Sequence, residues 1–287
     1  MLRAARNRPA KNTDPTRKLP ARKRIDAFGA VGLFGLLLVT VVALLPDLFT
    51  PFDPQLRVAQ ALLPPSTVHL FGTDEIGRDL FSRVVLGVRY TWIPSLIIVA
   101  VSFVLGSTIG LVSGFFGGWI DIILQRVTDI FFIVPSMLFA IAFAAVLGPG
   151  IEHTVLAIMM CWWPWYTWIA RDELRRIHAS PHYAGARVAG ATKARLLFRY
   201  SVPGVIPSLI VAAGVDVSNV VMTLSLMSFL GLGEPNPAPE LGALVSRSLD
   251  SLATFWWLPI LPAVAIFFIC LSANLLGDGI RHMLKGR

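Results

Sequence analysis

The chain has 287 residues, of which 55% are hydrophobic and only 15% are charged, and its mean hydropathy is +0.69. Soluble domains carry about 25% charged residues, so the composition excludes an ordinary soluble protein and indicates a chain that crosses a membrane several times. The net charge of +8 does not indicate nucleic-acid binding, because the basic residues cluster between or outside the apolar runs.

The chain opens with a basic tail. Residues 1–25 contain prolines, lysines and arginines with few apolar side chains, and we expect them to be disordered in the cytoplasm. Residues 26–48 are long enough to form a first transmembrane helix, since about 20 residues cross the hydrocarbon core. No A-x-A cleavage site follows this run, so we expect it to be retained rather than removed as a signal peptide.

The next segment, residues 49–91, is expected to be an extracytoplasmic loop. Its second half has apolar residues at helical spacing, which predicts a short helix at the membrane surface. Before this helix lies a glycine-framed turn with alternating charge, formed by Gly72, Thr73, Asp74, Gly77, Arg78 and Asp79. We expect Asp74 to cap a helix there; the alternative is that the turn contacts another protein.

Residues 92–280 form the core and contain five more apolar runs. These predict transmembrane helices at about 92–116, 121–147, 151–170, 203–231 and 256–277. In the first of them, small residues recur four apart at Gly106, Gly110 and Gly114, and Gly117 and Gly118 follow. Such a face lets helices approach closely in lipid, although glycine is also tolerated in membrane helices without close packing.

The basic residues predict the orientation of the chain. With the N-terminus inside, only Arg57, Arg78, Arg83, Arg89 and Arg247 of the 25 basic residues lie outside. Cytoplasmic loops are enriched in lysine and arginine. Both termini, including the tail at residues 281–287, are therefore expected in the cytoplasm.

Few polar residues interrupt the apolar runs. Asp216 and Asn219 are three apart and share a helical face, and an acid inside the membrane is a candidate functional residue. We expect this pair to line a translocation path; the alternative is a structural contact with a neighbouring helix or a partner. Asp129 lies one turn from Arg126, which predicts a structural ion pair. Cysteines and histidines are too few or too scattered for a metal site.

The connection at residues 171–200 is basic and rich in small residues. Its sequence "PHYAGARVAGATKARLLFRYSVPG" predicts a helix from Pro181 to Gly190, then a second helix up to Pro203. Small residues would let a partner protein approach the backbone closely. The alternative is an ordinary cytoplasmic loop whose charges bind anionic lipid.

The spacing within this connection resembles a known signature. Ala184 to Ala186, Gly190 and Pro203 are spaced as in the EAA-x3-G-x9-I-x-L-P motif of the membrane subunits of bacterial ABC importers. Two residues differ from that motif, since Ala184 stands for the usual Glu and Val202 for the usual Leu. The resemblance implies a coupling loop that docks on an ATP-binding subunit through Tyr183, Ala184, Gly185, Ala186, Arg187, Gly190, Ala191 and Pro203.

Further phrases in the same order extend the resemblance over residues 25–281. These are "FGTDEIGRDLFSRVVLGVR", "GLVSGFFGGWIDIILQRVTDIFFIVPSMLFAI", "LGPG", "LMSFLGLG" and "NLLGDGIR". Together they resemble the C-type permease of the peptide and nickel group of ABC importers. The resemblance implies an all-α fold with six transmembrane helices, in the bacterial cytoplasmic membrane, and marks the glycine-framed turn as the family's extracytoplasmic motif.

The resemblance also implies partners and a cargo. The partners are a homologous B-type permease, two ATP-binding subunits and an extracytoplasmic binding protein. ATP and Mg would lie on the partners, because the chain has no G-x4-G-K-[ST] phosphate cradle, and no cofactor or catalytic site is expected here. The cargo would be di- or oligopeptides; nickel chelates, glutathione, opines and glycosides stay open. A secondary transporter is disfavoured because paired carboxylates are missing from the apolar runs.

Overall fold

A computed structural model describes residues 27–233 and 238–285 of the chain, and this part is built from helices without a named strand. The expected disordered tail, residues 1–25, lies outside the described residues, as do the last two residues of the 281–287 tail. The helices are α1 Ala27–Leu44, η1 Pro46–Leu48, α2 Leu80–Phe116, α3 Gly118–Ile133, α4 Ser136–Leu147, α5 Ile151–His178, α6 Pro181–Val188, α7 Lys193–Leu196, η2 Leu197–Ser201, α8 Val202–Phe229, α9 Leu241–Arg247, η3 Leu249–Ser251 and α10 Trp257–Lys285.

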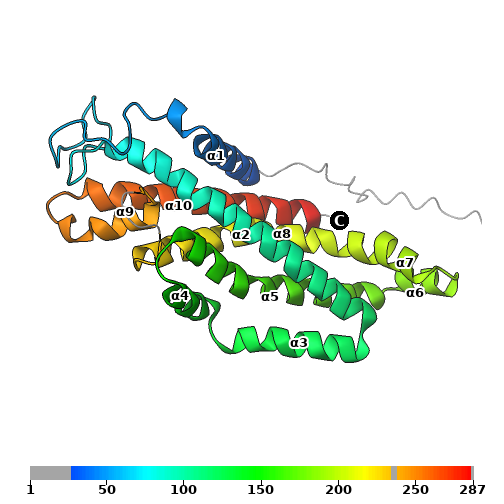
Figure 1. Cartoon of the computed structure of the whole chain (residues 1–287). Helices are drawn as coiled ribbons and strands as arrows, with labels where there is room; N and C mark the ends of the chain where they lie inside the picture. Colours follow the sequence, from blue (N-terminus) through cyan, green and yellow to red (C-terminus); the bar gives the residue numbers. More distant parts are fainter. Residues whose placement is uncertain (1–26, 234–237, 286–287) are drawn as a thin grey trace, which may run out of the picture.

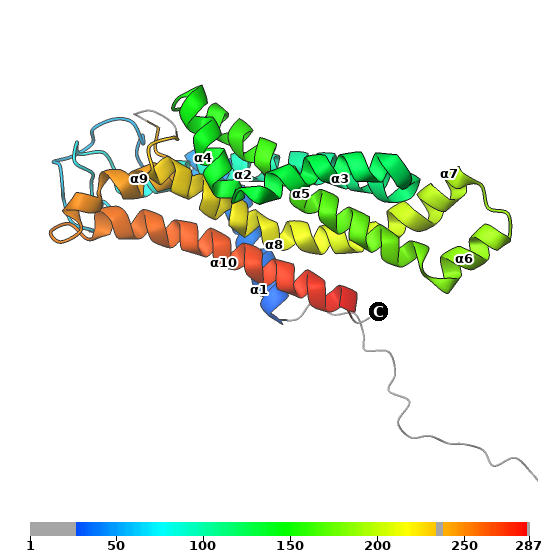
Figure 2. The same cartoon turned by 90° about the horizontal axis from the view of Figure 1, so that it is seen from below.

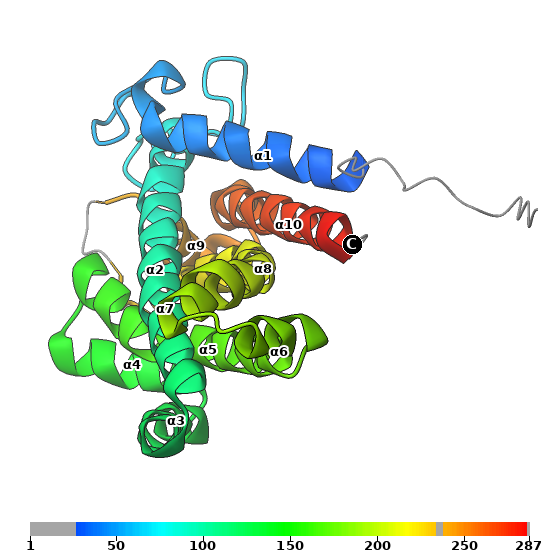
Figure 3. The same ribbon diagram turned by 90° about the vertical axis from the view of Figure 1, so that its right-hand side faces the viewer.

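The long helices run between two ends of the molecule. The loop at residues 49–79 and α9 lie at one end, and α6 and α7 lie at the other (Figures 1 and 2). The start of α1 and the end of α10 lie toward the same end as α6 (Figure 1). Figure 3 shows α2 reaching across the bundle, from α1 on one side to α3 on the other. This arrangement agrees with the predicted placement of both termini on the side of the basic connection.

Among residues 27–233 and 238–285, four helical segments are long and apolar enough to cross a membrane. They are α1, α2, the continuous stretch Lys193–Phe229 and the α10 segment Trp257–Met283. The bent pair of α3 and α4 makes a fifth if it is one span. The predicted fourth span, residues 151–170, lies in α5, which is continuous over 28 residues. Its tryptophans, proline and charged residues lower its hydropathy, and it is not among these apolar segments. A sixth span therefore stays a prediction, supported by the packing of α5 along α2 and α8.

A helix is present before residue 92, as predicted, but the prediction that it is a separate helix at the membrane surface is wrong. Residues 80–91 are the first turns of α2, which continues for 37 residues through Pro94. One face stays buried across the predicted boundary, at Val84, Val88 and Trp92. At 1.5 Å per residue the helix is about 55 Å long, so it exceeds the roughly 30 Å hydrocarbon core, and its outer turns pack under the loop.

The predicted span at residues 121–147 is broken in the middle. α3 ends at Ile133 and α4 begins at Ser136, and the two axes differ by 83°. Proline disfavours a helical conformation in the residue before it. Val134, which precedes Pro135, accordingly has an extended backbone with φ −105° and ψ 136°.

The glycine face of α2 packs closely against α5. A Cβ atom on Gly106 would lie 2.2 Å from the Trp163 carbonyl oxygen, and one on Gly110 would lie 2.4 Å from that of Thr167. The Thr167 hydroxyl donates a 3.0 Å hydrogen bond to the Gly106 carbonyl. These glycines therefore let two backbones touch, as the four-residue spacing predicted.

Candidate functional site

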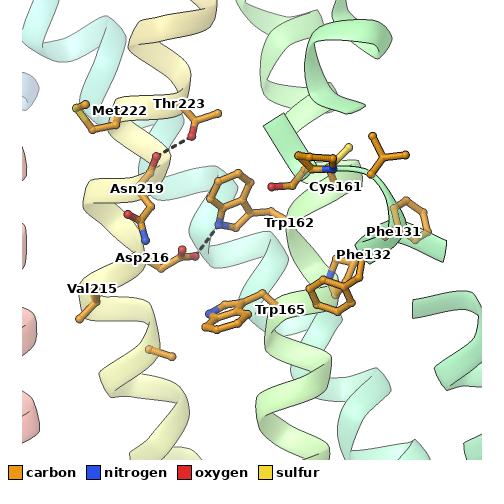
Figure 4. A pocket seen from close by; sticks show the side chains of 15 residues that line it. Phe131, Phe132, Cys161, Trp162, Trp165, Val215, Asp216, Asn219, Met222 and Thr223 are labelled. Carbon is orange, nitrogen blue, oxygen red and sulfur yellow. Dashed lines mark hydrogen bonds between the residues drawn. The ribbon is translucent and has the colours of Figure 1, made fainter. Parts of the chain in front are cut away.

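A pocket of about 650 Å³ lies between α5, α8 and the break between α3 and α4 (Figure 4). Asp216 is the fifteenth residue of α8, which runs from Val202 to Phe229, so it lies about 20 Å from either helix end. The pocket is therefore midway through the bundle. Its lining includes Phe131, Phe132, Pro135, Cys161, Trp162, Trp165, Val215, Asp216, Asn219, Met222 and Thr223.

The Asp216 carboxylate is the buried polar group of this pocket. The residue is 4% exposed. Its Oδ2 atom accepts a 2.8 Å hydrogen bond from the Trp162 indole and a 2.7 Å hydrogen bond from the Tyr166 hydroxyl. Asn219 lies on the same face of α8, and its side chain is beside Asp216 in Figure 4. The prediction that the two residues share a face is confirmed, and Asp216 also contacts a neighbouring helix, which was the alternative.

The two donors to Asp216 were missed by the sequence analysis. Trp162 and Tyr166 are four apart on α5, so they lie one turn from each other and face α8 together. The signal was present in the segment "CWWPWYTW", where polar-tipped aromatic residues recur in an apolar run. It could not indicate which of the tryptophans faces an acid more than 50 residues away.

The short helices α6 and α7 form a projection at the opposite end of the molecule from α9 (Figures 1 and 2). The first of them, α6, is capped at both ends. Ser180 caps α6 by accepting a hydrogen bond from the Tyr183 amide. At the other end of α6, Ala191 N–H donates to the Ala186 carbonyl and Gly190 N–H donates to the Arg187 carbonyl, both at 3.1 Å. This pair of bonds is the Schellman motif, which needs a residue with positive φ. Gly190 supplies it with φ +79°, so the glycine ends the helix as predicted.

Aromatic side chains attach this projection to the bundle. Tyr183 is 8% exposed, and its ring stacks on His178 with 4.3 Å between ring centroids. The His178 Nε2 atom lies 3.3 Å from the Ser201 hydroxyl at the start of α8. Burial lowers the pKa of His178 below its usual value. α6 therefore rests on the end of α5, and His178 of α5 in turn contacts the residue that precedes α8.

Most of the predicted coupling residues are exposed. Ala184, Gly185, Arg187 and Pro203 are exposed, Ala186 and Ala191 are half-buried, and Val188 is 89% exposed. A Cβ atom on Gly185 would meet no atom within 4 Å. Beneath the projection a groove of about 750 Å³ is lined by residues of α2, α5, α6 and α7. Of the predicted coupling residues, Tyr183 alone is buried, so it holds the projection in place.

The glycine-framed turn in the outer loop is fastened to its own chain. Asp74 Oδ1 accepts hydrogen bonds from the Ile76 and Arg78 amides, and its Oδ2 pairs with the Arg78 guanidinium at 2.6 Å. The Thr73 hydroxyl donates to the Gln60 carbonyl at 2.7 Å. A Cβ atom on Gly77 would lie 2.3 Å from the Ala59 carbonyl oxygen. The turn therefore closes the 49–79 loop on itself.

The predicted helix cap at Asp74 is wrong, because the cap of α2 is Asp79. Asp79 Oδ2 accepts a 2.8 Å hydrogen bond from the Ser82 amide, and its Oδ1 lies 2.9 Å from His69 Nδ1. Helix α2 starts at Leu80, five residues later than a cap at Asp74 requires. Asp74 instead stabilises the tight turn and pairs with Arg83 at 3.4 Å.

A second polar cluster, also missed, links three helices near the projection. Asp121 of α3 receives Arg171 of α5 in a two-point contact of 2.5 and 2.6 Å, and Arg175 at 3.0 Å. The hydroxyl of Ser113 from α2 also donates to Asp121 at 2.5 Å. The predicted pair of Arg126 and Asp129 is present at 3.7 Å but is exposed. Within the described residues, no group of three or more potential ligands is placed to hold a metal ion.

Comparison with known proteins gives a consistent family. Residues 106–287 match the family described as "Binding-protein-dependent transport system inner membrane component". The chain is 36% identical to the probable D,D-dipeptide transport system permease protein DdpC of Escherichia coli K12, over 86% of this chain and 84% of that protein. It is 35% identical to the dipeptide transport system permease protein DppC of Haemophilus influenzae, over 88% of each. It is 34% identical to the glutathione transport system permease protein GsiD of Pectobacterium atrosepticum, over 89% and 85%.

Solved structures share the fold at low sequence identity. An inward-facing MetNI methionine ABC transporter structure has a TM-score of 0.59 at 16% identity, covering 71% of this chain and 96% of that chain. An amino acid ABC transporter crystallised with histidines has a TM-score of 0.56, also at 16% identity, covering 70% and 94%. The chain therefore shares its fold with a chain of each of these ABC transporters.

Proposed function

The chain belongs to the family of binding-protein-dependent transport system inner membrane components, and from this membership we propose that it provides half of the membrane pathway of a peptide importer. It is a multi-pass permease subunit of an ABC importer in the bacterial inner membrane. The names of its relatives support peptides as the cargo, because both DdpC and DppC are named as permeases for dipeptides. The relative named for glutathione keeps that cargo as the second candidate.

The complete importer would contain a homologous B-type permease, two ATP-binding subunits that hold ATP and Mg, and an extracytoplasmic binding protein. This chain has no phosphate-binding glycine loop of its own, so energy has to reach it through contact with another subunit. The exposed surface of α6 at Gly185 is suited to that contact, because the missing side chain allows close approach. The aromatic attachment of Tyr183 to His178 would transmit movement of α6 to the bundle.

One observation carries the mechanism that we propose. α6 and α7 connect α5 to α8. α5 carries Trp162 and α8 carries Asp216, and both residues line the midspan pocket. Displacing the projection would therefore shift α5 relative to α8 and change the width of the pocket. We propose that the pocket, with Asp216 and Asn219, lies on the translocation path.

The outer turn has a supporting role in this proposal. Its charged side chains bind their own loop and the start of α2. The turn at Gly72–Asp79 would keep the outer surface in the conformation that the binding protein contacts. Exposed residues of the same loop, such as Glu75 and Ile76, would make the contact itself.

The proposed function is tested by reconstitution. The chain is purified with its partner permease and ATP-binding subunits, inserted into lipid vesicles, and supplied with the binding protein and ATP. Uptake of radiolabelled dialanine that depends on ATP would support the proposal. ATP-dependent uptake of glutathione or a nickel chelate without dialanine uptake would identify that compound as the cargo in place of peptides. A lack of ATP-dependent uptake of all three would contradict the proposal.

A further inference from the structure

The acid in the midspan pocket has no cationic partner in the described part of the chain. None of the ion pairs among the described residues includes Asp216. Burying a charged group without a counter-charge is costly. A buried acid that faces a pocket therefore favours a cation there.

Two donors from α5 bind the same oxygen of Asp216. The indole N–H of Trp162 is a donor only, and the Tyr166 hydroxyl also points its bond to the same Oδ2 atom. An oxygen that accepts two hydrogen bonds is not the one that carries a proton. Asp216 itself lines the pocket, with Asn219 beside it on α8 (Figure 4).

The walls of the pocket suit an ammonium group. Trp162, Trp165, Phe131 and Phe132 line the same pocket as the acid. Aromatic faces attract cations within about 6 Å of the ring centroid. Asn219 and Thr223 add neutral polar groups on the α8 side. The rim is open, since Met222 is 57% exposed and Trp165 is 46% exposed. A compact cation can therefore reach the carboxylate between aromatic rings.

From these observations we propose that the pocket binds the free α-ammonium group of peptide cargo, with Asp216 as the counter-charge. This inference rests on the proposed function and specifies the chemistry that the pathway recognises. The binding would be weak, because a site on a pathway has to release what it binds. Glutathione and dipeptides both carry such a group, whereas an N-acetylated peptide does not.

The test measures binding of peptide to the membrane complex alone. The purified complex of both permeases and ATP-binding subunits, without binding protein, is dialysed against radiolabelled dialanine, with unlabelled dialanine or N-acetyl-dialanine as competitor. For the unaltered complex we expect dialanine to compete at least tenfold better than the acetylated peptide. In Asp216→Asn this preference should fall to within twofold, because asparagine fills the same space without the charge.

Two further variants make the result specific. Asp216→Glu keeps the negative charge and should regain part of the preference for the free amino group. Asp47→Asn removes an exposed acid at the outer end of α1, far from the pocket, and should leave the preference unchanged. Co-elution of all subunits and ATP hydrolysis stimulated by the binding protein show that each variant is assembled.

Several outcomes would overturn the inference. They are an absence of saturable dialanine binding, equal competition by the acetylated peptide, and an unchanged preference in assembled Asp216→Asn. Each of them would mean that Asp216 serves the packing of α5 on α8 or pairs with a lysine or arginine of the neighbouring permease. Failure of the proposed function is seen separately, since dialanine uptake in vesicles would then be missing in the unaltered importer.

Discussion

At the scale of single residues, the projection contains two glycines, Gly185 and Gly190, whose backbone conformations differ. Gly190 has φ +79° and closes the Schellman motif, yet a Cβ atom there would meet nothing in the chain. Gly185 has no positive φ, and its surroundings are equally empty. Gly190 is therefore required by the backbone, whereas nothing in the described chain requires glycine at position 185, which suits the close approach of a partner that we propose.

This difference predicts that substitutions at the two glycines cause two distinct defects. Gly190→Val forces a β-branched residue into the left-handed region, which costs about 1–2 kcal/mol, so α6 should fray and hydrogen exchange at the amides of residues 184–191 should rise. Gly185→Leu should leave that exchange unchanged but lower the import of dialanine per ATP hydrolysed, because its side chain occupies the docking surface. Normal coupling in Gly185→Leu would contradict the close approach of a partner.

His178 makes the attachment of the projection depend on pH. Burial lowers its pKa, so the imidazole binds a proton less readily when α6 is docked than when it is released. Protonation therefore favours release as the pH falls below the ordinary histidine pKa of about 6.5. We expect the amides of α6 to exchange faster at pH 5.5 than at pH 7.5, after correction for the intrinsic rate. His178→Phe, which keeps the ring stacking on Tyr183, should show no such change; an equal pH dependence in both proteins would exclude His178 as its source.

At the scale of helices, the polar contacts that cross between elements explain which helices move together. The Asp121 cluster joins α3 to α5 and α2 at the end that carries the projection. The glycine face of α2 brings α5 into backbone contact over the following turns. α2, α3 and α5 are therefore expected to move as one unit, with α8 on the other side of the pocket.

Breaking the Asp121 contact should loosen α3. Asp121 and Arg171 are 12% and 18% exposed, so removing one partner leaves a poorly solvated charge, which typically costs about 1–3 kcal/mol. We expect Arg171→Met and Asp121→Asn each to lower the thermal stability of the purified permease, and the double variant to cost less than the sum of the two. Strict additivity in this double-mutant cycle would show that the two side chains do not interact.

The glycine contact between α2 and α5 can be tested by adding a single side chain. A Cβ atom on Gly110 would lie 2.4 Å from the Thr167 carbonyl oxygen, so Gly110→Val should separate the helices at a cost of about 1–3 kcal/mol or more. Val104 is on the opposite side of α2 and is 62% exposed. Val104→Leu should therefore change the melting temperature little, and equal effects of the two substitutions would contradict the close contact.

The helices themselves were predictable, but some of their boundaries were not. Runs of apolar residues predicted α1, α8 and α10 because the hydropathy of one segment is a local property. The prediction separated residues 80–91 from α2 because charged Arg83 and Arg89 interrupt the run, although Arg83 is buried under the outer loop. The contacts of Asp216 with Trp162 and of Asp121 with Arg171 join distant segments, so they follow only from the packing of helices.

At the scale of the whole molecule, the structure separates two surfaces across the length of the bundle. The 49–79 loop and α9 form one end, and α6 with α7 forms the other (Figure 2). This separation predicts that cysteines introduced at Ala184 and Ile76 react with a membrane-impermeant maleimide from opposite sides of the membrane, position 184 from the cytoplasm. The native cysteines, Cys161 and Cys270, are buried, so we expect little background labelling from them. Labelling of both positions from one side would overturn the predicted orientation.

The break between α3 and α4 has a consequence for solvation. Val134, Pro135 and Ser136 line the midspan pocket, and α4 begins there without a side-chain cap. The last carbonyls of α3 and the first amides of α4 need hydrogen-bond partners, and lipid tails provide none. We therefore expect water to enter the middle of the bundle and bind those groups that no protein atom binds, so the proposed pathway would be wetted before any cargo arrives. A peptide would then cross without giving up its whole hydration shell.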